Sequence, residues 1–250
     1  MAPPAIALPD PLVGWVSRLE LPSPAMAAPL AHVPQTATTL VVRTEPDGRT
    51  DLAVVGPQTR ATYSDGGDAA RCAWIRLSAG AVPTLLGIPA SDLADGGARL
   101  VELPGPAARL AETLRDTSPE DALRRFADAL QLPLETRAER ARRDLLRAAV
   151  GALAAGTPVR DLPRFLGVGE RRVRTLFNTG IGVSPKHVSR IERLRRALAR
   201  AGRVPWAALA ADSGYYDQSH LTTDFRRMMG VPPAAFVRGV RPPATCRPGV

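Results

Sequence analysis

The sequence predicts an α+β N-terminal domain, in which helices accompany a small and mostly antiparallel sheet. An all-α domain follows, with two helix-turn-helix units joined by a connecting helix. Three observations predict this order. Short apolar runs separated by turn residues come first, helical spacing of apolar residues replaces them from Val82 onward, and one pattern near the C-terminal end recurs 48 residues later.

The strands are expected in the first part of the chain. One is predicted over 12–21 and two more over about 38–44 and 50–56, with Pro46-Asp47-Gly48 supplying the turn of a hairpin. A further apolar run covers 72–77. With this hairpin, the region is predicted to form a small and mostly antiparallel sheet.

Helical spacing then predicts four helices. They are expected over 82–86, 91–93, 106–115 and 119–130. Residues 131–137, which contain Pro133, form a candidate boundary, and no strand is expected after it. We therefore expect an α+β domain over 1–135, an all-α domain over 136–240 and a C-terminal tail over 241–250.

The charge of the chain is divided unevenly between these parts. The whole sequence carries a net charge of +9, yet residues 136–250 hold 22 Lys or Arg against 8 Asp or Glu, whereas residues 1–135 hold 11 against 16. This excess predicts that the C-terminal part binds a polyanion. For the charge alone, a solvated basic surface explains the excess equally well.

The recurring pattern is the most informative feature of the C-terminal part. The matching pairs are Val173 with Leu221, Phe177 with Phe225, Gly182 with Gly230, Val183 with Val231, Pro185 with Pro233, and Arg190 with Arg238. Each copy has a short helix, a turn, a second helix closed by Gly and a segment that begins with Pro, which is the layout of a helix-turn-helix. Two such units in tandem predict double-stranded DNA as the polyanion.

A connecting helix is expected between the two units. It begins at Pro185 with Ser184 as its N-cap, and its arginines are expected to form a solvated or phosphate-facing strip: Arg190, Arg193, Arg195 and Arg196. The other helices are expected over 138–155, 161–166, 170–179, 207–212 and 218–229. Asp217 is the predicted N-cap of the last of these helices.

Two segments carry a family resemblance. Residues 214–233, GYYDQSHLTTDFRRMMGVPP, resemble the signature of AraC-type (AraC/XylS) transcriptional regulators, and residues 169–177 with 182–185 are similar to the first helix-turn-helix of that family. The likeness covers about 140–240. It implies a bacterial, cytoplasmic transcription regulator that inserts two recognition helices, about 170–179 and 218–229, into successive major-groove segments.

The resemblance also implies which side chains face DNA. In the first unit they are Arg171, Arg174 and Thr175, with Arg172 placed to contact phosphate; in the second they are Gln218, Ser219, Thr222 and Thr223. Helical spacing agrees, because Val173 and Phe177 form a buried stripe on the other side of the first recognition helix. Arg suits guanine, Gln suits adenine, and Thr contacts bases through its hydroxyl or methyl group.

Two residues depart from the family pattern in the first unit. Pro163 stands where the scaffold helix normally has a small residue, and it is tolerated if Asp161 is the N-cap, because proline then lies in the first turn. Gly169 replaces the usual Ser at the cap of the first recognition helix. The first unit is therefore expected to be less rigid than the second.

The N-terminal part resembles a domain that precedes this DNA-binding module in many bacterial regulators. Trp15, residues 56–59 and residues 85–93 carry the likeness, which implies a sensor or dimerisation role and identifies no ligand. The aromatic and histidine side chains of this part are expected to fill its core rather than line a pocket: Trp15, His32, Tyr63 and Trp74. Trp206 and Tyr215 are likewise expected in the core of the C-terminal part.

Two alternative functions are weighed against a regulator. A cysteine-dependent repair or alkyl-transfer enzyme has Cys72 as its only candidate nucleophile, in a predicted strand and without a metal cluster or a helix N-terminus to activate it. A nonspecific basic nucleic-acid-binding protein does not need two recognition helices at a fixed offset. We therefore expect no enzyme activity.

The expected partners follow from the same reasoning. Double-stranded DNA is the expected partner. Three further partners are left open: RNA polymerase, an unidentified small-molecule effector and a second copy of the chain. Cys72 and Cys246 match no metal spacing, so no cofactor or metal is expected. No uncharged apolar run approaches the roughly 20 residues of a membrane span, and the proline-rich N-terminus does not resemble a signal peptide.

Overall fold

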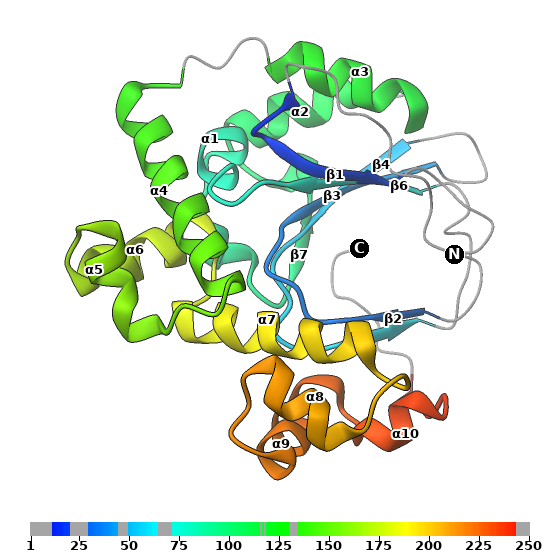
Figure 1. The fold of residues 1–250 in the computed structure, drawn as a ribbon. Helices are drawn as coiled ribbons and strands as arrows, with labels where there is room; N and C mark the ends of the chain where they lie inside the picture. The colour runs from blue at the N-terminus through cyan, green and yellow to red at the C-terminus, as the bar shows by residue number, and fades with distance from the viewer. Residues whose placement is uncertain are drawn as a thin grey trace.

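The computed structural model describes residues 12–20, 30–44, 50–64, 72–115, 117, 119–130 and 135–243. The expected turn at 46–48, most of the boundary at 131–137, the end of the tail and Cys246 lie outside these residues. Figure 1 shows a sheet with helices on one side, followed by helices only. The predicted fold class is confirmed.

A five-stranded antiparallel sheet forms the centre of the N-terminal part. Its order is β1-β6-β3-β4-β7. The strands are β1 (Val16–Glu20), β3 (Thr39–Thr44), β4 (Thr50–Val55), β6 (Cys72–Leu77) and β7 (Gly97–Arg99). β1 begins four residues later than the predicted strand, because residues 12–15 form a turn closed by the Trp15 N–H donating to the Leu12 carbonyl at 3.0 Å.

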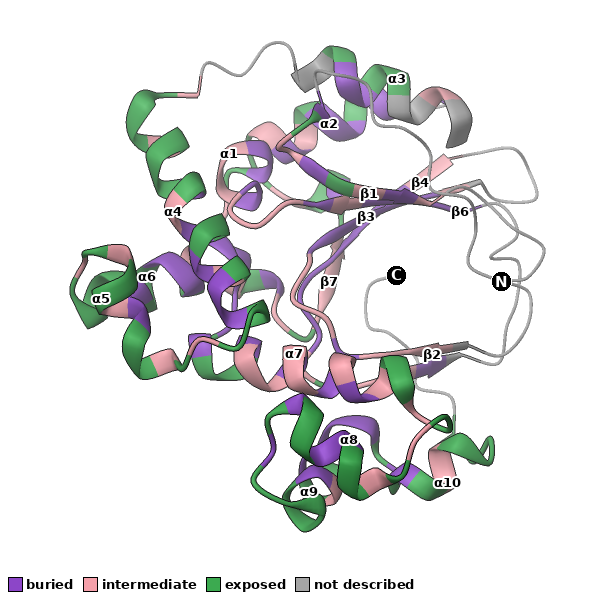
Figure 2. Ribbon diagram, in the orientation of Figure 1, coloured by how far each residue is buried: buried purple, intermediate pink, exposed green. Residues whose placement is uncertain are grey.

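The two faces of this sheet have different neighbours. On one face, Leu40, Val42 and Ile75 are almost completely buried beneath the helices α1 (Val82–Leu86), α2 (Pro106–Leu114) and α3 (Pro119–Leu130) (Figure 2). The opposite face looks toward a two-stranded ribbon of β2 (Leu30–His32) and β5 (Thr62–Ser64), which the sequence did not predict. This second face therefore lies between the two sheets.

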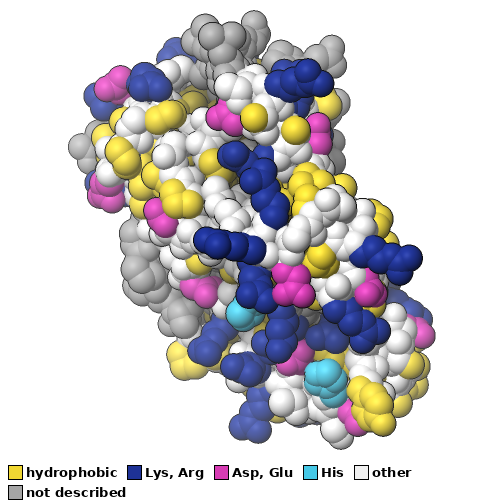
Figure 3. Space-filling view, turned by 90° about the vertical axis from the view of Figure 1, so that its left-hand side faces the viewer, with side chains coloured by type: hydrophobic (Ala, Val, Ile, Leu, Met, Phe, Trp, Pro, Cys, Tyr) yellow, Lys and Arg dark blue, Asp and Glu magenta, His cyan; other side chains and the backbone are white. Residues whose placement is uncertain are grey.

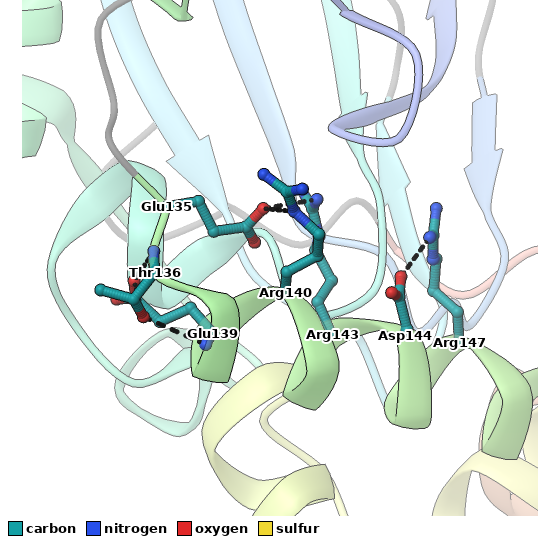
Figure 4. Close-up of polar contacts among 7 residues, drawn as sticks. All are labelled: Glu135, Thr136, Glu139, Arg140, Arg143, Asp144 and Arg147. Carbon is teal, nitrogen blue, oxygen red and sulfur yellow. Dashed lines mark hydrogen bonds and ion pairs between the residues drawn. The ribbon is translucent and has the colours of Figure 1, made fainter.

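Helix α4 (Arg137–Ala154) leads into the C-terminal part and is anchored at its start (Figure 4). Thr136 and Glu139 form a reciprocal capping box, and the hydrogen bonds from Thr136 lower the pKa of Glu139. One turn on, the buried Arg143 donates to Glu135 Oε2 at 2.9 Å and lies 3.8 Å above the ring of Trp15. Burial lowers the pKa of Arg143 despite the Glu135 carboxylate.

The C-terminal part repeats one arrangement twice. The first unit contains α5 (Leu162–Leu166) and α6 (Glu170–Gly180), and the second contains α8 (Trp206–Ser213) and α9 (Gln218–Met229). The helix α7 (Pro185–Arg200) connects them, and α10 (Pro233–Val237) follows the second unit. Phe177 and Phe225, which stand 48 residues apart, are each 0% exposed in separate cores.

The N-terminal part contacts both units directly. The Gly80 N–H donates to the Gly180 carbonyl at the end of α6 at 3.0 Å, and the Tyr63 hydroxyl donates to the Met229 carbonyl at the end of α9 at 2.6 Å. Gly182 has φ +91°, and a side chain there would overlap the backbone of Ala90 in the 3-10 helix η4 (Ala90–Leu93). The two helix-turn-helix units are thus both docked on the sheet domain.

Candidate nucleic-acid interface

Helix α6 exposes one polar face to solvent. Its apolar residues Val173, Leu176 and Phe177 are buried, so the helix turns the opposite side outward. All four predicted contact residues of this unit are exposed: Arg171, Arg172, Arg174 and Thr175. Asn178, which the sequence reasoning missed, is also exposed. It falls on the stripe of Arg171 and Arg174 at spacings of seven and four residues, which is the signal that would have found it.

Two contacts hold this face in place. Arg174 Nη2 lies 3.2 Å from Glu170 Oε2, and the Thr175 hydroxyl donates to the Arg171 carbonyl at 3.0 Å. The Arg174–Glu170 pair is exposed on both sides, so exchanging it for a DNA contact costs little. Arg171 forms no ion pair with a described residue. The first unit therefore presents two guanidinium groups to solvent. That of Arg171 has no described ion-pair partner, and that of Arg174 can exchange its exposed ion pair with Glu170 for a DNA contact.

Helix α9 presents a face with less charge. Leu221, Phe225 and Met228 are buried, and the predicted residues Gln218, Ser219 and Thr223 are exposed. Thr222 is half-buried and lies at the edge of this face, whereas an exposed position was predicted for it. The two helices expose different chemistry: arginines on α6, and amide and hydroxyl groups at the start of α9.

The caps of the two helices differ as predicted. The Asp217 carboxylate accepts from the His220 N–H at 2.7 Å at the start of α9, whereas Gly169 gives α6 no side-chain cap. Pro163 lies in the first turn of α5, so the scaffold helix forms. The predicted cap is wrong in its mechanism, however, because the Asp161 side chain makes no capping bond and its backbone is helical. A 3-10 turn over Val159–Asp161 precedes α5 instead.

The arginines of α7 correct a second prediction. They do not form a solvated strip: Arg190 Nη2 binds Asp224 Oδ1 at 2.7 Å and keeps only 15% of its side chain exposed. Arg193 donates to the Gly214 carbonyl at 3.3 Å and lies 5.0 Å from the ring of Tyr215. Asp224, a buried residue of α9, attracts these cations inward. The connecting helix is therefore bonded to the second unit.

A cationic surface extends beyond the recognition helices. Arg60, His187, Arg190 and Arg227 line a polar hollow of about 90 Å³ where β4–β5, α7 and α9 meet. Figure 3 shows Lys and Arg side chains in a band over the middle and lower part of one face. Arg60 was not predicted from the sequence. It lies within residues 1–135, whose net charge is negative, and a charge count over that whole segment does not single out one arginine.

The remaining predicted core residues divide into two groups. Tyr215 and Tyr63 are each 5% exposed, and Trp206 packs edge-on against Phe225 at 5.8 Å between ring centroids, as expected for core residues. His32 and Trp74 do not fill the core, and both line a cavity between the sheet and α7. The prediction was wrong for these two because Trp74 lies on the face of the sheet opposite the main core, whereas His32 lies on β2 of the two-stranded ribbon.

Neither a metal-binding cluster nor a membrane-spanning helix is found in the described part of the chain. Its His, Cys, Asp and Glu side chains form no group of three or more that could hold a metal ion. Cys72 is buried on the sheet, with 5% of its surface exposed. Among the described helices, none has the length and apolar character needed to cross a bilayer.

Two helix-turn-helix units, each with an exposed polar second helix, define a DNA-binding domain of the tandem helix-turn-helix class. Residues 162–239 match the model of a helix-turn-helix domain family. With the signature at 214–233, this region is a helix-turn-helix domain of the AraC type, the DNA-binding part of a transcription regulator.

Two solved structures are similar to the chain over most of its length. The crystal structure of ToxT from Vibrio cholerae O395 has a TM-score of 0.42 and 12% identity, covering 85% of this chain and 94% of that chain. A variant of apo ToxT from strain SCE256 has a TM-score of 0.42 and 10% identity, covering 88% and 96%. Similarity at this level is too low to assign any property of ToxT to this chain. No curated protein sequence matches it.

Proposed function

We propose that this regulator binds DNA sequence-specifically by inserting α6 and α9 into successive major-groove segments of one site. The observation that carries the proposal is the equivalent placement of the two helices. Each buries its apolar stripe in a core of its own and turns a polar face outward. A nonspecific basic protein needs only charge, whereas α9 offers amide and hydroxyl groups that suit base edges.

The two units have different roles in this proposal. In α6, Arg171 and Arg174 read guanine edges and Thr175 contacts a base or its methyl group, while Arg172 holds phosphate. In α9, Gln218 reads adenine, and hydroxyl groups make the neighbouring contacts: Ser219, Thr222 and Thr223. On one face of B-DNA, successive major-groove segments lie about 34 Å apart, so a single chain reads an asymmetric site.

The N-terminal sheet domain is proposed to act as a sensor that changes how the two helix-turn-helix units bind DNA. Its hydrogen bonds from Gly80 to the end of α6 and from Tyr63 to the end of α9 support this role, because they connect this domain directly to both units. RNA polymerase and a second copy of the chain remain proposed partners.

The Arg171→Ala variant tests the reading role. We expect it to lower the affinity for a selected site by about 1–3 kcal/mol and to relax the preference at one base pair. Titration against the selected DNA and single-base variants of it measures both effects. The Arg172→Ala variant is the control, since loss of a phosphate contact weakens binding equally on all sequences and lowers the salt dependence. Equal losses on all sequences for Arg171→Ala would make Arg171 a phosphate contact.

A further inference from the structure

One polar hollow gathers cations from both parts of the chain. It has a volume of about 90 Å³ and is lined by Arg60 from the loop between β4 and β5, by His187 of α7 and by Arg227 of α9. Arg190 lines it as well, but its guanidinium is already bonded to the Asp224 carboxylate. The sheet domain thus supplies a cation to a site that the helix-turn-helix units otherwise form.

Arg60 and Arg227 bring positive charge to this hollow. Both residues are exposed, and neither forms an ion pair with a described residue. The Asp95 carboxylate is held by Thr59, the neighbour of Arg60: Oδ1 accepts from the Thr59 N–H at 2.6 Å and Oδ2 from its hydroxyl at 2.7 Å. An anion in the hollow would therefore meet two guanidinium groups that have no described ion-pair partner.

The backbone is fixed on both sides of Arg60. Before it, Thr59 is bound to Asp95, a residue that adopts φ +56°. After it, the Ala61 N–H donates to the Met228 carbonyl in the last turn of α9 at 2.7 Å. The backbone of Arg60 therefore needs no further ordering when its side chain binds a ligand, which favours binding.

His187 adds a donor from the start of α7. Its Nδ1 lies 3.1 Å from the hydroxyl of Ser184, which is the N-cap of that helix. In the tautomer in which Ser184 donates to Nδ1, Nε2 carries the ring proton and can donate to an anion. The positive end of the helix dipole at this terminus also favours a negative charge. Guanidinium and imidazole donors from three elements thus meet at one hollow.

The hollow lies where the chain passes from the first unit to the second. His187 is in the first turn of α7, which begins at Pro185 shortly after α6 ends at Gly180. Arg227 stands four residues after the exposed Thr223, so it lies one turn further along the same side of α9. When α6 and α9 occupy successive major-groove segments, the sugar-phosphate backbone crosses the region between them.

We propose that Arg60 of the sheet domain holds a phosphate of the DNA backbone, together with Arg227 and His187, while α6 and α9 read the bases. The sheet domain then belongs to the DNA-binding surface itself. A phosphate contact carries no base information, so this domain adds affinity and fixes the position of the chain on the duplex. This inference rests on the proposed function, since it requires DNA to lie along both recognition helices.

The salt dependence of DNA binding by the full chain tests the contact. Arg60→Gln changes an exposed side chain, so the fold is expected to persist. We expect it to weaken binding about three- to tenfold, on the selected site and on unrelated duplexes alike. The slope of log K against log salt should become less steep by about 1.

Arg109→Gln is the matched control for the loss of one positive charge. Arg109 is an exposed residue of α2, on the main-core face of the sheet, and forms no ion pair with a described residue. Its replacement should leave the DNA affinity within about twofold of wild type, because charges outside the interface are largely screened by salt. An affinity within twofold and an unchanged slope in Arg60→Gln would overturn the proposal.

Duplexes that carry one neutral methylphosphonate at a time locate the contact. At the phosphate held in the hollow, the substitution should weaken wild-type binding about as much as Arg60→Gln does, and it should weaken Arg60→Gln by about twofold or less. Arg227→Gln should show a reduced loss at the same phosphate. If Arg60→Gln loses as much affinity as wild type at every substituted position, Arg60 contacts no phosphate.

Two further outcomes separate this inference from the proposed function. If inorganic phosphate binds the chain without DNA, and Arg60→Gln abolishes that binding while DNA affinity is unchanged, the hollow holds a free anion and the inference is overturned. If the wild type selects no DNA sequence but the salt slope still falls by about 1 in Arg60→Gln, the proposed function fails and the phosphate contact stands.

Discussion

Tyr215 illustrates how one buried group acts in the second unit. Its ring is held between Arg193, at 5.0 Å, and His220, whose ring centroid lies 5.4 Å away. The hydroxyl is buried and has no hydrogen-bond partner among the described residues. Burial, assisted by the Asp224 charge, raises the pKa of Tyr215 to about 12. The side chain thus contributes through its ring and not through its hydroxyl.

The Tyr215→Phe variant separates these contributions. Near neutral pH we expect its free energy of unfolding to lie within about 1 kcal/mol of wild type, because the ring remains and only an unsatisfied hydroxyl is lost. An unfolded tyrosine releases its proton near pH 10, whereas the folded one holds it to about 12. The wild type should therefore lose stability as the pH rises from about 10 to 12. The variant has no proton to release at this position, so it should lose less.

Urea unfolding at several pH values measures this difference. Tyr216→Phe is the matched control for the loss of a tyrosine hydroxyl, since Tyr216 is 93% exposed. A constant difference between wild type and Tyr215→Phe across this alkaline range would show that Tyr215 titrates in the folded state as it does in the unfolded state.

At the scale of elements, the two recognition helices differ in their caps. Gly169 has φ −71° and ψ 157°, which serine adopts readily, and a side chain there meets no other atom within 4 Å. Gly169→Ser should stabilise the protein by about 0.5–1 kcal/mol, through a new cap and a less flexible unfolded chain. Asp217→Ala removes an existing cap and should destabilise it by about 1 kcal/mol.

Chemical denaturation of both variants checks this comparison. Gly169→Ala is the control for the cap itself, because it restricts the unfolded chain without supplying an acceptor. If the Gly169→Ser and Gly169→Ala variants unfold alike, the first unit gains nothing from a side-chain cap, which would contradict the expectation that the missing cap makes this unit less rigid.

Most of the elements that the sequence predicted have enough residues to show a period, although the short helical segment over 91–93 was also predicted and is found as η4. The helices over 106–115, 119–130 and 170–179 and the strands over 38–44 and 50–56 were found within a few residues of their bounds. β2, β5 and β7 have three residues each, too few for alternation to be visible. The order of the sheet was not predictable either, because β1 pairs with β6 across a long stretch of sequence.

The features of the candidate site also divide into those that the local sequence predicts and those that it does not. The family resemblance indicated the exposed faces of α6 and α9, and helical periodicity agreed for α6, since it depends only on neighbouring turns of one helix. The ion pair of Arg190 with Asp224 and the hollow shared by Arg60 and Arg227 depend on elements far apart in sequence. Such contacts arise from tertiary packing and leave no local pattern.

At the scale of the whole molecule, close approach of backbones joins the sheet domain to the first unit. Gly182 combines φ +91° with contact to the Ala90 backbone, so Gly182→Ala should destabilise the protein by about 2 kcal/mol or more through strain and overlap. Gly167→Ala is the matched control. Gly167 has φ +64° but no atom within 4 Å of the added carbon, so only the conformational penalty of about 1 kcal/mol applies.

Urea denaturation of the full chain gives both values. Equal losses for the two variants would mean that the contact between Gly182 and Ala90 does not persist in solution. A larger loss for Gly182→Ala would support a sheet domain docked directly on the DNA-reading unit, as the proposed sensor role requires.

Two unequal units of one chain are proposed to read one DNA site. Selection of binding sites from random double-stranded DNA tests this proposal, using wild type, an Arg171→Ala/Arg174→Ala variant and a Gln218→Ala/Ser219→Ala variant. We expect two preferred sequence blocks about 10 base pairs apart in the wild-type sites, with a different block lost in each variant. Recovery of no preferred sequence, or loss of both blocks together in either variant, would contradict it.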